Sequence, residues 1–345
     1  MTIIYPDRVE NPIISQQQWR PFVAKKLILD VDTGTDDAVA IMLAAVHPSL
    51  DLVAITTVNG NVEVEKCTDN TLRTLEWIGR ADVPVYQGLS HPIVREDFPT
   101  PRATKRDPKV HMAVLPLPEA KGKKKELSAP VFLTEIFTEQ AGEITLVAVG
   151  PLSNLAAAIA IDPGFPSKVA ELIIMGGAVN KSNITPSAEF NIWADPEAAA
   201  QVFRAGFRKI TLVPLDATHE ALVSRDQCNQ LRALGSQAGI AAADIIEHRI
   251  NGYEANQPTG TPQTAPVHDA VCVAALVDEG IIETKFVNVV IETTGEFTVG
   301  RTVVDHEKRT TRAPNCHVAF HADRSAFFAM LSNTFAGEAP QSKIA

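Results

Sequence analysis

Short apolar runs alternate with segments of helical periodicity along most of the chain. The first run, residues 26–32, is rich in Leu, Ile and Val and is followed by Gly34, which is the pattern of a buried strand. Residues 38–45 have the composition of a good helix, and Asp36 and Asp37 precede them, where a helix N-terminus favours negative charge. The pattern therefore predicts a strand that leads directly into a helix.

The same alternation recurs downstream. Further strands are predicted over residues 52–58, 83–86, 144–149, 172–175 and 210–214, and helices over 64–78, 153–161 and 196–203. Asp195 followed by Pro196 is typical of a helix start with proline at its first position. Strands that alternate with helices indicate a mostly parallel central sheet covered on both faces. The predicted fold class is α/β, a Rossmann-like open sheet flanked by helices.

Three further segments depart from this alternation. Residues 1–26 are polar and contain several prolines, so we expect an irregular N-terminal extension that precedes a single domain over residues 27–345. Residues 95–130 lack periodicity and contain six prolines, which predicts a long loop of the kind that is usually functional or disordered. Near the C-terminus, strands predicted over 286–291, 297–304 and 317–320 would form a small antiparallel ribbon appended to the main sheet.

The overall charge limits the classes of partner. The 345 residues include 31 Lys and Arg and 41 Asp and Glu, a formal net charge of −10, which argues against nucleic acid as a partner. No apolar run approaches the roughly 18 residues of a membrane span, so no membrane association is expected. The four cysteines form no C-x-x-C pair, and the polar N-terminal stretch does not resemble a secretory signal, which together predict a cytoplasmic location.

Four carboxylates lie within eight residues, at Asp30, Asp32, Asp36 and Asp37, where the first strand ends and the first helix begins. Ligands of open α/β sheets bind at this carboxyl edge of the strands. Like charges packed this closely repel one another unless a cation offsets them. Because the available ligand atoms are all oxygens, a hard cation such as Ca²⁺ or Mg²⁺ is favoured over zinc.

Three other kinds of site contain acids in a comparable arrangement. A polar helix start with solvated acids needs only one or two carboxylates. A helix–loop–helix calcium site would require Glu at the twelfth position from Asp30, where this chain has Ile41. A phosphatase of the haloacid dehalogenase class also begins with D-x-D after a strand, but it has Thr or Val where this chain has Gly34. The phosphatase stays open as an alternative.

The cluster and its surroundings resemble the N-terminal fingerprint of the inosine-uridine preferring nucleoside hydrolase family. Matching segments follow in the family's order through residues 27–320. They are DVDTGTDDA from Asp30, AITTVNGN from Ala54, GPLSNLA from Gly150, MGGA from Met175, AEFNIWADPEAA from Ala188 and VHDA from Val267. The resemblance implies an enzyme that hydrolyses the N-glycosidic bond of ribonucleosides to ribose and a free nucleobase with bound Ca²⁺. It also implies a homo-oligomer, a dimer or tetramer.

Site residues follow from the resemblance position by position. It implies that the calcium ligands are Asp32, Asp37, Asp269 and the main-chain oxygen of Val149, and that Asp32 is also the general base. The implied ribose contacts are Asp36, Asn61, Asn183, Glu189 and Asn191, with His268 as the acid that faces the nucleobase and Tyr253 beside it.

These roles agree with the chemistry of the reaction. The bond breaks through an oxocarbenium-like state, whose positive charge carboxylates and amide oxygens stabilise when they are fixed in advance. A bound cation lowers the pKa of water and anchors the ribose diol, and Asp32 beside that water would accept its proton. On the far side, we expect His268 to have a pKa near ~6.5 and to protonate the departing base.

Several of these residues also have purely structural interpretations. Asp269 could serve only as a helix start, and Asn61 only as a turn residue after Gly60. Glu189 and Asn191 flank Phe190, so in an extended segment both would face one side, either toward ribose or toward solvent.

The segment after His111 departs from the family pattern. Family members often have a glycine-rich flap there, whereas this chain continues with apolar residues and a proline. A stiffer loop would alter closure over the substrate, which leaves a non-catalytic nucleoside-binding relative as a second alternative.

Overall fold

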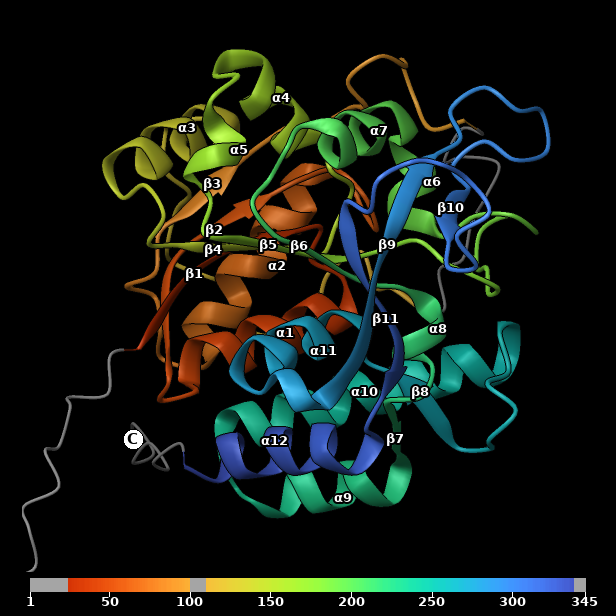
Figure 1. The fold of residues 1–345 in the computed structure, drawn as a ribbon. Coiled ribbons are helices and arrows are strands. Elements are labelled where there is room, and N and C mark those ends of the chain that lie inside the picture. Colours follow the sequence, from red (N-terminus) through yellow and green to blue (C-terminus); the bar gives the residue numbers. More distant parts are fainter. Residues whose placement is uncertain (1–23, 100–109, 338–345) are drawn as a thin grey trace, which may run out of the picture.

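A sheet of nine strands forms the centre of the protein, in the order β10-β9-β11-β6-β5-β4-β1-β2-β3 (Figure 1). We describe a computed structural model, which covers residues 24–99 and 110–337. The strands are β1 (Lys25–Val31), β2 (Leu50–Thr57), β3 (Val85–Gln87), β4 (Thr145–Ala148), β5 (Glu171–Met175), β6 (Ile210–Val213), β9 (Ile282–Ile291), β10 (Thr302–Asp305) and β11 (Cys316–Ala322). All neighbours from β11 to β3 are parallel, as predicted.

The predicted ribbon near the C-terminus is present but is continuous with the main sheet. Strand β9 is antiparallel to both β10 and β11, and β11 in turn runs parallel to β6. Two predicted boundaries are wrong by four residues or more. The strand expected over 286–291 already begins at Ile282, and the strand expected over 297–304 begins only at Thr302. Residues 296–300 form a turn that ends at Gly300, whose φ of 79° suits glycine. The separate two-stranded sheet of β7 (Leu222–Ser224) and β8 (Thr264–Pro266) was not predicted.

Helices cover both faces of the sheet. They are α1 (Thr35–Val46), α2 (Val64–Trp77), α3 (Ala129–Glu139), α4 (Ser153–Ile161), α5 (Phe165–Lys168), α6 (Phe190–Ala194), α7 (Pro196–Arg204), α8 (Leu215–Thr218), α9 (Arg225–Ala233), α10 (Gln237–Asn256), α11 (His268–Val277) and α12 (Arg324–Ala336), with a 3-10 turn at Glu279–Ile281. In Figure 1, α3, α4, α5 and α7 lie above the sheet, and α1, α11 and α12 lie below it.

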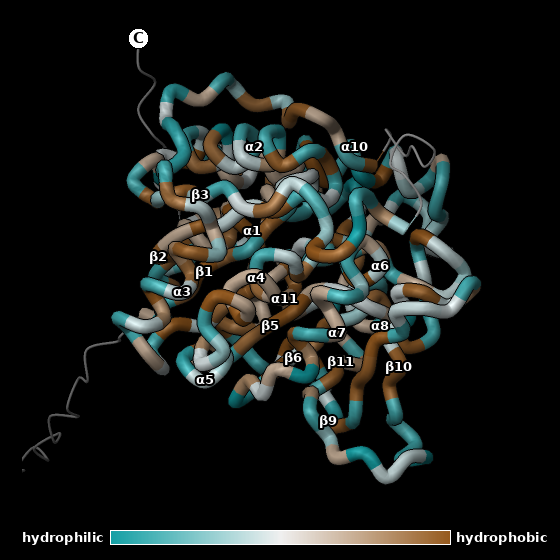
Figure 2. The backbone as a smooth tube through the Cα atoms, turned by 90° about the horizontal axis from the view of Figure 1, so that it is seen from above, coloured by the Kyte–Doolittle hydropathy of each residue, from teal (hydrophilic) through white to brown (hydrophobic). Residues whose placement is uncertain are grey.

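Alternation along the strands explains the two-layered core. In β1, Leu27, Leu29 and Val31 join the core cluster under α1 and α11, whereas Ile28 joins the cluster under α3, α4 and α7. All four side chains are fully buried, as both faces of a parallel sheet require. Figure 2 accordingly shows β1 and β5 largely in brown at the centre, with hydrophilic loops around the periphery.

The two segments that are expected to be irregular, residues 1–26 and 95–130, are only partly covered by the described residues. Residues 1–23 of the predicted extension lie outside the described residues, and β1 begins at Lys25, two positions before the predicted domain boundary. In the predicted loop over 95–130, residues 100–109 also lie outside the described part, and α3 begins at Ala129, at its end. The division into an extension and one domain stays a prediction.

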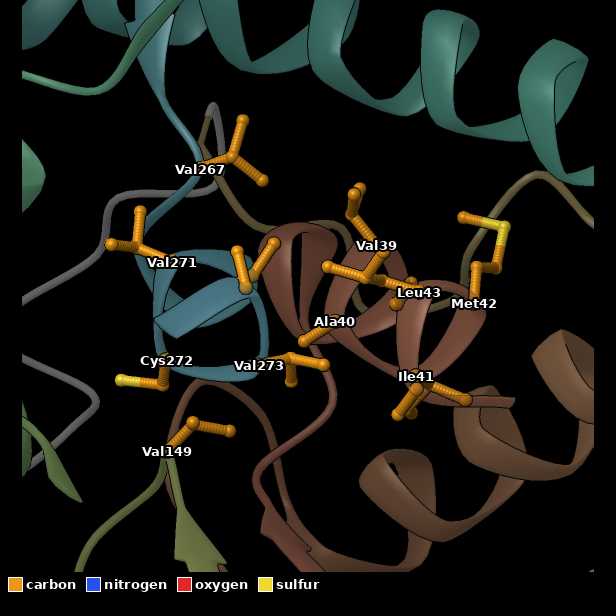
Figure 3. Packing of buried hydrophobic residues seen from close by; sticks show 14 of the residues in the cluster. Val39, Ala40, Ile41, Met42, Leu43, Val149, Val267, Val271, Cys272 and Val273 are labelled. Atoms are coloured by element: carbon orange, nitrogen blue, oxygen red, sulfur yellow. The ribbon is translucent and has the colours of Figure 1, made fainter. Parts of the chain in front are cut away.

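Packing between α1 and α11 brings together two segments that are far apart in the sequence. Figure 3 shows these helices side by side, with Ala40 and Val273 between them and Val149 at the end of β4 beneath α11. Their N-terminal residues include Asp36 and Asp37 on α1 and Asp269 on α11. A buried apolar contact therefore positions acids that are more than 230 residues apart in sequence.

Candidate active site

The loop between β1 and α1 is held by the carboxylate of Asp37. Its Oδ1 accepts a hydrogen bond from the Asp32 backbone N–H at 3.1 Å, and its Oδ2 accepts one from the Gly34 N–H at 2.8 Å. The side-chain amide of Asn61, from the loop after β2, donates to the same Oδ2 at 3.2 Å. Asp37 is the third residue of α1, and its carboxylate thus caps the backbone of the N-cap residue Gly34 and fixes the path of the acidic loop.

The carboxylate of Asp32 is oriented through a hydrogen bond to one of its oxygens, and its other oxygen has no partner among the described residues. Its Oδ2 accepts the Asn61 backbone N–H at 2.7 Å, whereas its Oδ1 is buried and finds no hydrogen-bond partner among the described residues. A Cβ at Gly60 would lie 1.9 Å from Asp32 Oδ2, so only glycine leaves room for this carboxylate. A buried carboxylate oxygen without a partner is costly and calls for a ligand.

Three neighbouring acids converge on one point. Within the described part of the chain, Asp36, Asp37 and Asp269 offer carboxylate oxygens that lie within 4.8 Å of one another, and all three side chains are buried. An all-oxygen set of this kind fits a hard divalent cation. This convergent set differs from the predicted ligands, because it contains Asp36, which is expected to bind ribose, and does not contain Asp32. The residues present fit a divalent cation, and the assignment of the individual calcium ligands stays a prediction.

The pKa values of these acids reflect their crowding. Burial, followed by the charge of Asp37, raises the pKa of Asp32 well above its usual value. Burial and the charges of Asp36 and Asp37 do the same to Asp269, and burial and Asp36 raise the pKa of Asp37 to about 6. A bound cation would reverse these shifts, because it stabilises the ionised carboxylates.

The stability of the metal-free protein should fall as the pH rises through neutrality. Burial, as the largest cause, raises the pKa of Asp30 and of Glu189 to about 7 and that of Asp37 to about 6. The unfolded carboxyls titrate near ~4, so the folded state binds protons more tightly. Their contribution is full below about pH 4 and is lost as the pH passes through 6 to 7.

We therefore expect the Tm of chelator-treated protein to decrease between pH 5 and pH 8. Excess Ca²⁺ should raise the Tm more at pH 8 than at pH 5, because binding to the folded state adds stability only when the acids are ionised. Thermal unfolding in a pH series with and without Ca²⁺ measures both effects. A Tm of the metal-free protein that rises steadily to pH 8 would contradict the expectation.

On the other wall of the site, Glu189 and Asn191 face the cavity from a helix rather than from the extended segment that was expected. Glu189 is the N-cap of α6, and its carboxylate accepts the backbone N–H groups of Gly177 at 2.8 Å and Asn191 at 2.9 Å. Asn191 Nδ2 donates to the main-chain oxygen of Val149 at 2.8 Å. The extended interpretation is wrong because capping by Glu189 starts a short helix here.

His268 forms hydrogen bonds through both ring nitrogens. Its Nδ1 lies 2.6 Å from Thr218 Oγ1, and its Nε2 lies 2.7 Å from the Tyr253 hydroxyl. Burial, and then the nearby charge of His219, lower the pKa of His268 well below its usual value. The expectation of an ordinary pKa near neutrality is therefore wrong, and the imidazole is neutral at pH 7.

One cavity unites most of the predicted site residues. Those that line it are Asp36, Asn61, Val149, Asn183, Glu189, Asn191, Tyr253, His268 and Asp269. Asp32 and Asp37 do not line it but lie behind Gly60 and Asp36, at the positions described above. The opposite wall is apolar and includes Phe98, Phe190 and Trp193, which pack as one aromatic cluster. A polar floor beneath an apolar wall suits a sugar that bears a flat aromatic group.

His111 also lines this cavity, although the segment after it lacks the family's glycines. A Cβ at Gly34 would lie 2.2 Å from His111 Nδ1, so the ring packs directly on the acidic loop. Next to it, the main-chain oxygen of Val110 accepts a hydrogen bond from Thr35 Oγ1 at 3.2 Å. This segment is therefore tied to the start of α1.

The most important site residue that sequence patterns did not single out is Arg249. It lies on α10 with 0% of its surface exposed, and it lines the cavity in direct contact with Asp36. Arg249 stands among apolar residues that are buried in the same helix, such as Ile245, Ile246 and Ile250. This pattern could have identified it from the sequence. An arginine in an apolar helix implies a buried negative partner. Thr218 and His219 were likewise missed, because α8 is only one turn long.

The chain belongs to the inosine-uridine preferring nucleoside hydrolase family, whose family model matches residues 27–329. It is accordingly an enzyme of the nucleoside hydrolase class. Among curated proteins, it is 35% identical over 311 residues to the pyrimidine-specific ribonucleoside hydrolase RihA of Escherichia coli, an alignment that covers 90% of this chain and 98% of the relative.

Solved structures show the same fold. A purine-preferring ribonucleoside hydrolase from Gardnerella vaginalis superposes with a TM-score of 0.83 at 30% identity, covering 92% of this chain and all of that one (100%). A plant nucleoside hydrolase, PpNRh1, gives a TM-score of 0.83 at 30% identity over 91% of this chain and 99% of its own. Within residues 24–99 and 110–337, no helix combines the length and apolarity that crossing a bilayer requires.

Proposed function

We propose that the protein hydrolyses the N-glycosidic bond of ribonucleosides by attack of a water molecule that Asp32 activates, with Ca²⁺ as cofactor. The observations that best support this are the convergence of the Asp36, Asp37 and Asp269 oxygens within 4.8 Å and the buried, unpartnered oxygen of Asp32 in the loop that leads to α1. The family supplies the reaction, and the geometry supports the assignment of roles to residues.

Asp32, Asp37, Asp269 and the main-chain oxygen of Val149 would hold the cation. Calcium is the ion of choice because the set contains only oxygens and combines carboxylates with a carbonyl. When bound, it would anchor the ribose hydroxyls and lower the pKa of the attacking water. Val149 O already accepts one hydrogen bond from Asn191, and its second lone pair stays available.

Asp32 is suited to the role of general base. Its Oδ2 is fixed by the Asn61 backbone N–H, so its Oδ1 has a defined direction. That oxygen would accept a proton from a water held beside it.

Ribose would be held by Asp36, Asn61, Asn183, Glu189 and Asn191, the polar residues of the cavity. Backbone N–H groups fix Glu189, and Asn183 Oδ1 accepts the Phe190 N–H at 2.9 Å. Negative and amide groups that are fixed in advance stabilise the positive charge that develops on the ribose ring.

The leaving base would receive its proton from the pair formed by Tyr253 and His268. Because the imidazole is neutral, the Tyr253 hydroxyl would pass its proton to the departing base while Nε2–H of His268 donates a hydrogen bond to the phenolate oxygen. Solvent water would then reprotonate the tyrosinate after the base has left. Thr218 on Nδ1 fixes the orientation of the ring. This route needs no charged histidine at neutral pH.

His268→Ala should lower kcat for inosine and uridine by about 100-fold, because general acid catalysis by a positioned group contributes at least that much. A riboside with a nitrophenolate leaving group needs no protonation, so its turnover should change little. Steady-state kinetics on the three substrates measure the contrast. Equal losses on all three, or no loss on any, would remove His268 from the proton route.

A substrate panel tests the proposed function against its alternatives. The full chain is incubated with inosine, uridine and a generic phosphate ester, and free ribose and phosphate are assayed. We expect ribose from at least one nucleoside. Binding without ribose release would identify a non-catalytic relative, and phosphate release would identify a phosphatase. A cytoplasmic location and a homo-oligomeric state stay predictions.

A further inference from the structure

Arg249 connects three elements at the edge of the acidic cluster. Its Nη1 donates to Asp36 Oδ1 at 2.7 Å and to Thr35 Oγ1 at 2.6 Å, both at the start of α1. Its Nε donates to the main-chain oxygen of Pro266 in β8 at 3.1 Å, and its guanidinium lies 5.4 Å from the centre of the Tyr253 ring. The ion pair is almost entirely buried, with side-chain exposures of 1% and 5%.

The three convergent acids differ in their partners. Asp37 accepts hydrogen bonds from backbone and amide N–H groups, and Asp269 accepts none from the described residues. Of the three, only Asp36 is paired with a cationic side chain. Burying a guanidinium beside a metal site is electrostatically unfavourable unless it has a specific partner, so the pairing with Asp36 needs an explanation.

We propose that Arg249 is a positioning residue that reserves Asp36 for the substrate. By pairing with Oδ1, it removes from the cation a carboxylate that is otherwise close enough to bind it. The cation is then left to Asp37 and Asp269, and Asp36 lines the cavity where ribose would bind. This inference rests on the proposed function, because the cation and the ribose are those assigned above.

Opposite effects on two ligands follow from this division of roles. Without the guanidinium, Asp36 becomes free to bind the cation, and one positive charge that repels a divalent ion is removed. Calcium should therefore bind more tightly. Substrate should bind more weakly, because Asp36 is no longer held for the ribose hydroxyl. A purely structural arginine would weaken both when removed.

The experiment is a calcium titration by calorimetry on chelator-treated full-length protein, together with KM for inosine and uridine. We expect Arg249→Met to bind Ca²⁺ about tenfold more tightly and to raise KM about tenfold. Arg249→Lys keeps the positive charge, so its calcium affinity and its KM should each stay within about threefold of the wild-type values. The double variant Asp36→Asn/Arg249→Met removes both partners, and its calcium affinity should return to within about threefold of the wild type.

Calcium affinity that is unchanged or weaker in folded Arg249→Met would overturn the inference. If circular dichroism shows that this variant is unfolded, Asp36→Asn decides instead. Arg249 is then left unpaired beside the cation, so affinity should fall about tenfold and recover in the double variant. A double variant that binds calcium as weakly as Asp36→Asn would show that Asp36 is itself a calcium ligand.

A wild-type protein that binds no Ca²⁺ would refute the proposed cofactor and this inference with it. Wild-type binding without the Arg249→Met effect would refute only the inference.

Discussion

Asp32→Asn should lower kcat for nucleoside hydrolysis by about 10²- to 10⁴-fold, the range expected for loss of a general base. The amide oxygen of asparagine can still accept the Asn61 backbone N–H, so the local fold is retained. The amide nitrogen would occupy the position of Oδ1, which has no protein partner, and it cannot accept a proton from water. The substitution removes the proton-accepting oxygen and also changes one of the proposed calcium ligands, so kcat is measured at saturating Ca²⁺ to separate the two roles.

Steady-state kinetics on inosine and uridine, with thermal unfolding as a check of folding, measure this effect. Asp51→Asn is a matched control, because Asp51 is an exposed residue of β2 and lies outside the cavity. It should leave kcat unchanged. Near-full activity of Asp32→Asn would show that another group accepts the proton.

Asp269→Asn should weaken calcium binding by at least about 100-fold, because even residues that only support a ligand cost 10- to 100-fold when removed. The same change should raise the Tm of the metal-free protein at pH 8. Burial and the charges of Asp36, Asp37 and Asp32 raise the pKa of Asp269, so its ionised form is destabilised without a cation. A variant that binds calcium more weakly and is nevertheless more stable without metal is expected for a calcium ligand and not for a residue that only supports the fold.

Asp37→Asn is the informative comparison. Asp37 is also a proposed calcium ligand, but its carboxylate accepts three hydrogen bonds that fix the loop between β1 and α1. An amide cannot accept all three without bringing an N–H group against another donor, so this variant should lose stability as well as calcium. Calorimetry and thermal unfolding in chelator measure both quantities.

An Asp269→Asn variant that binds Ca²⁺ like the wild type would refute the ligand assignment.

Sequence patterns predicted the parallel sheet because buried strands such as β1 and β4 are short, apolar and rich in branched residues. The same patterns did not predict helices α9 and α10, for a different reason in each case. α9 is short and mostly polar, with only Cys228 and Leu231 buried. α10 packs against α1, α9 and α12, so its buried residues are not confined to a single stripe. Elements that are buried on several sides give no clear periodic signal.

The candidate site could be predicted only as a set of residues. Local spacing indicated the cluster at Asp32 and Asp37, but the approach of Asp269 depends on the packing of α11 against α1. The lowered pKa of His268 depends on burial beside His219, and the partner of Asp36 is Arg249, more than 200 positions away. Contacts between distant elements determine these properties, and no local pattern contains them.

The central claim is that a divalent cation held by these acids is required for release of ribose. The most direct measurement is ribose production from inosine and uridine by protein that has been stripped with a chelator, before and after Ca²⁺ is restored. The account predicts no ribose above background from the stripped protein and full recovery with Ca²⁺, in proportion to the calcium bound. Undiminished ribose release from protein shown to contain no metal would contradict it.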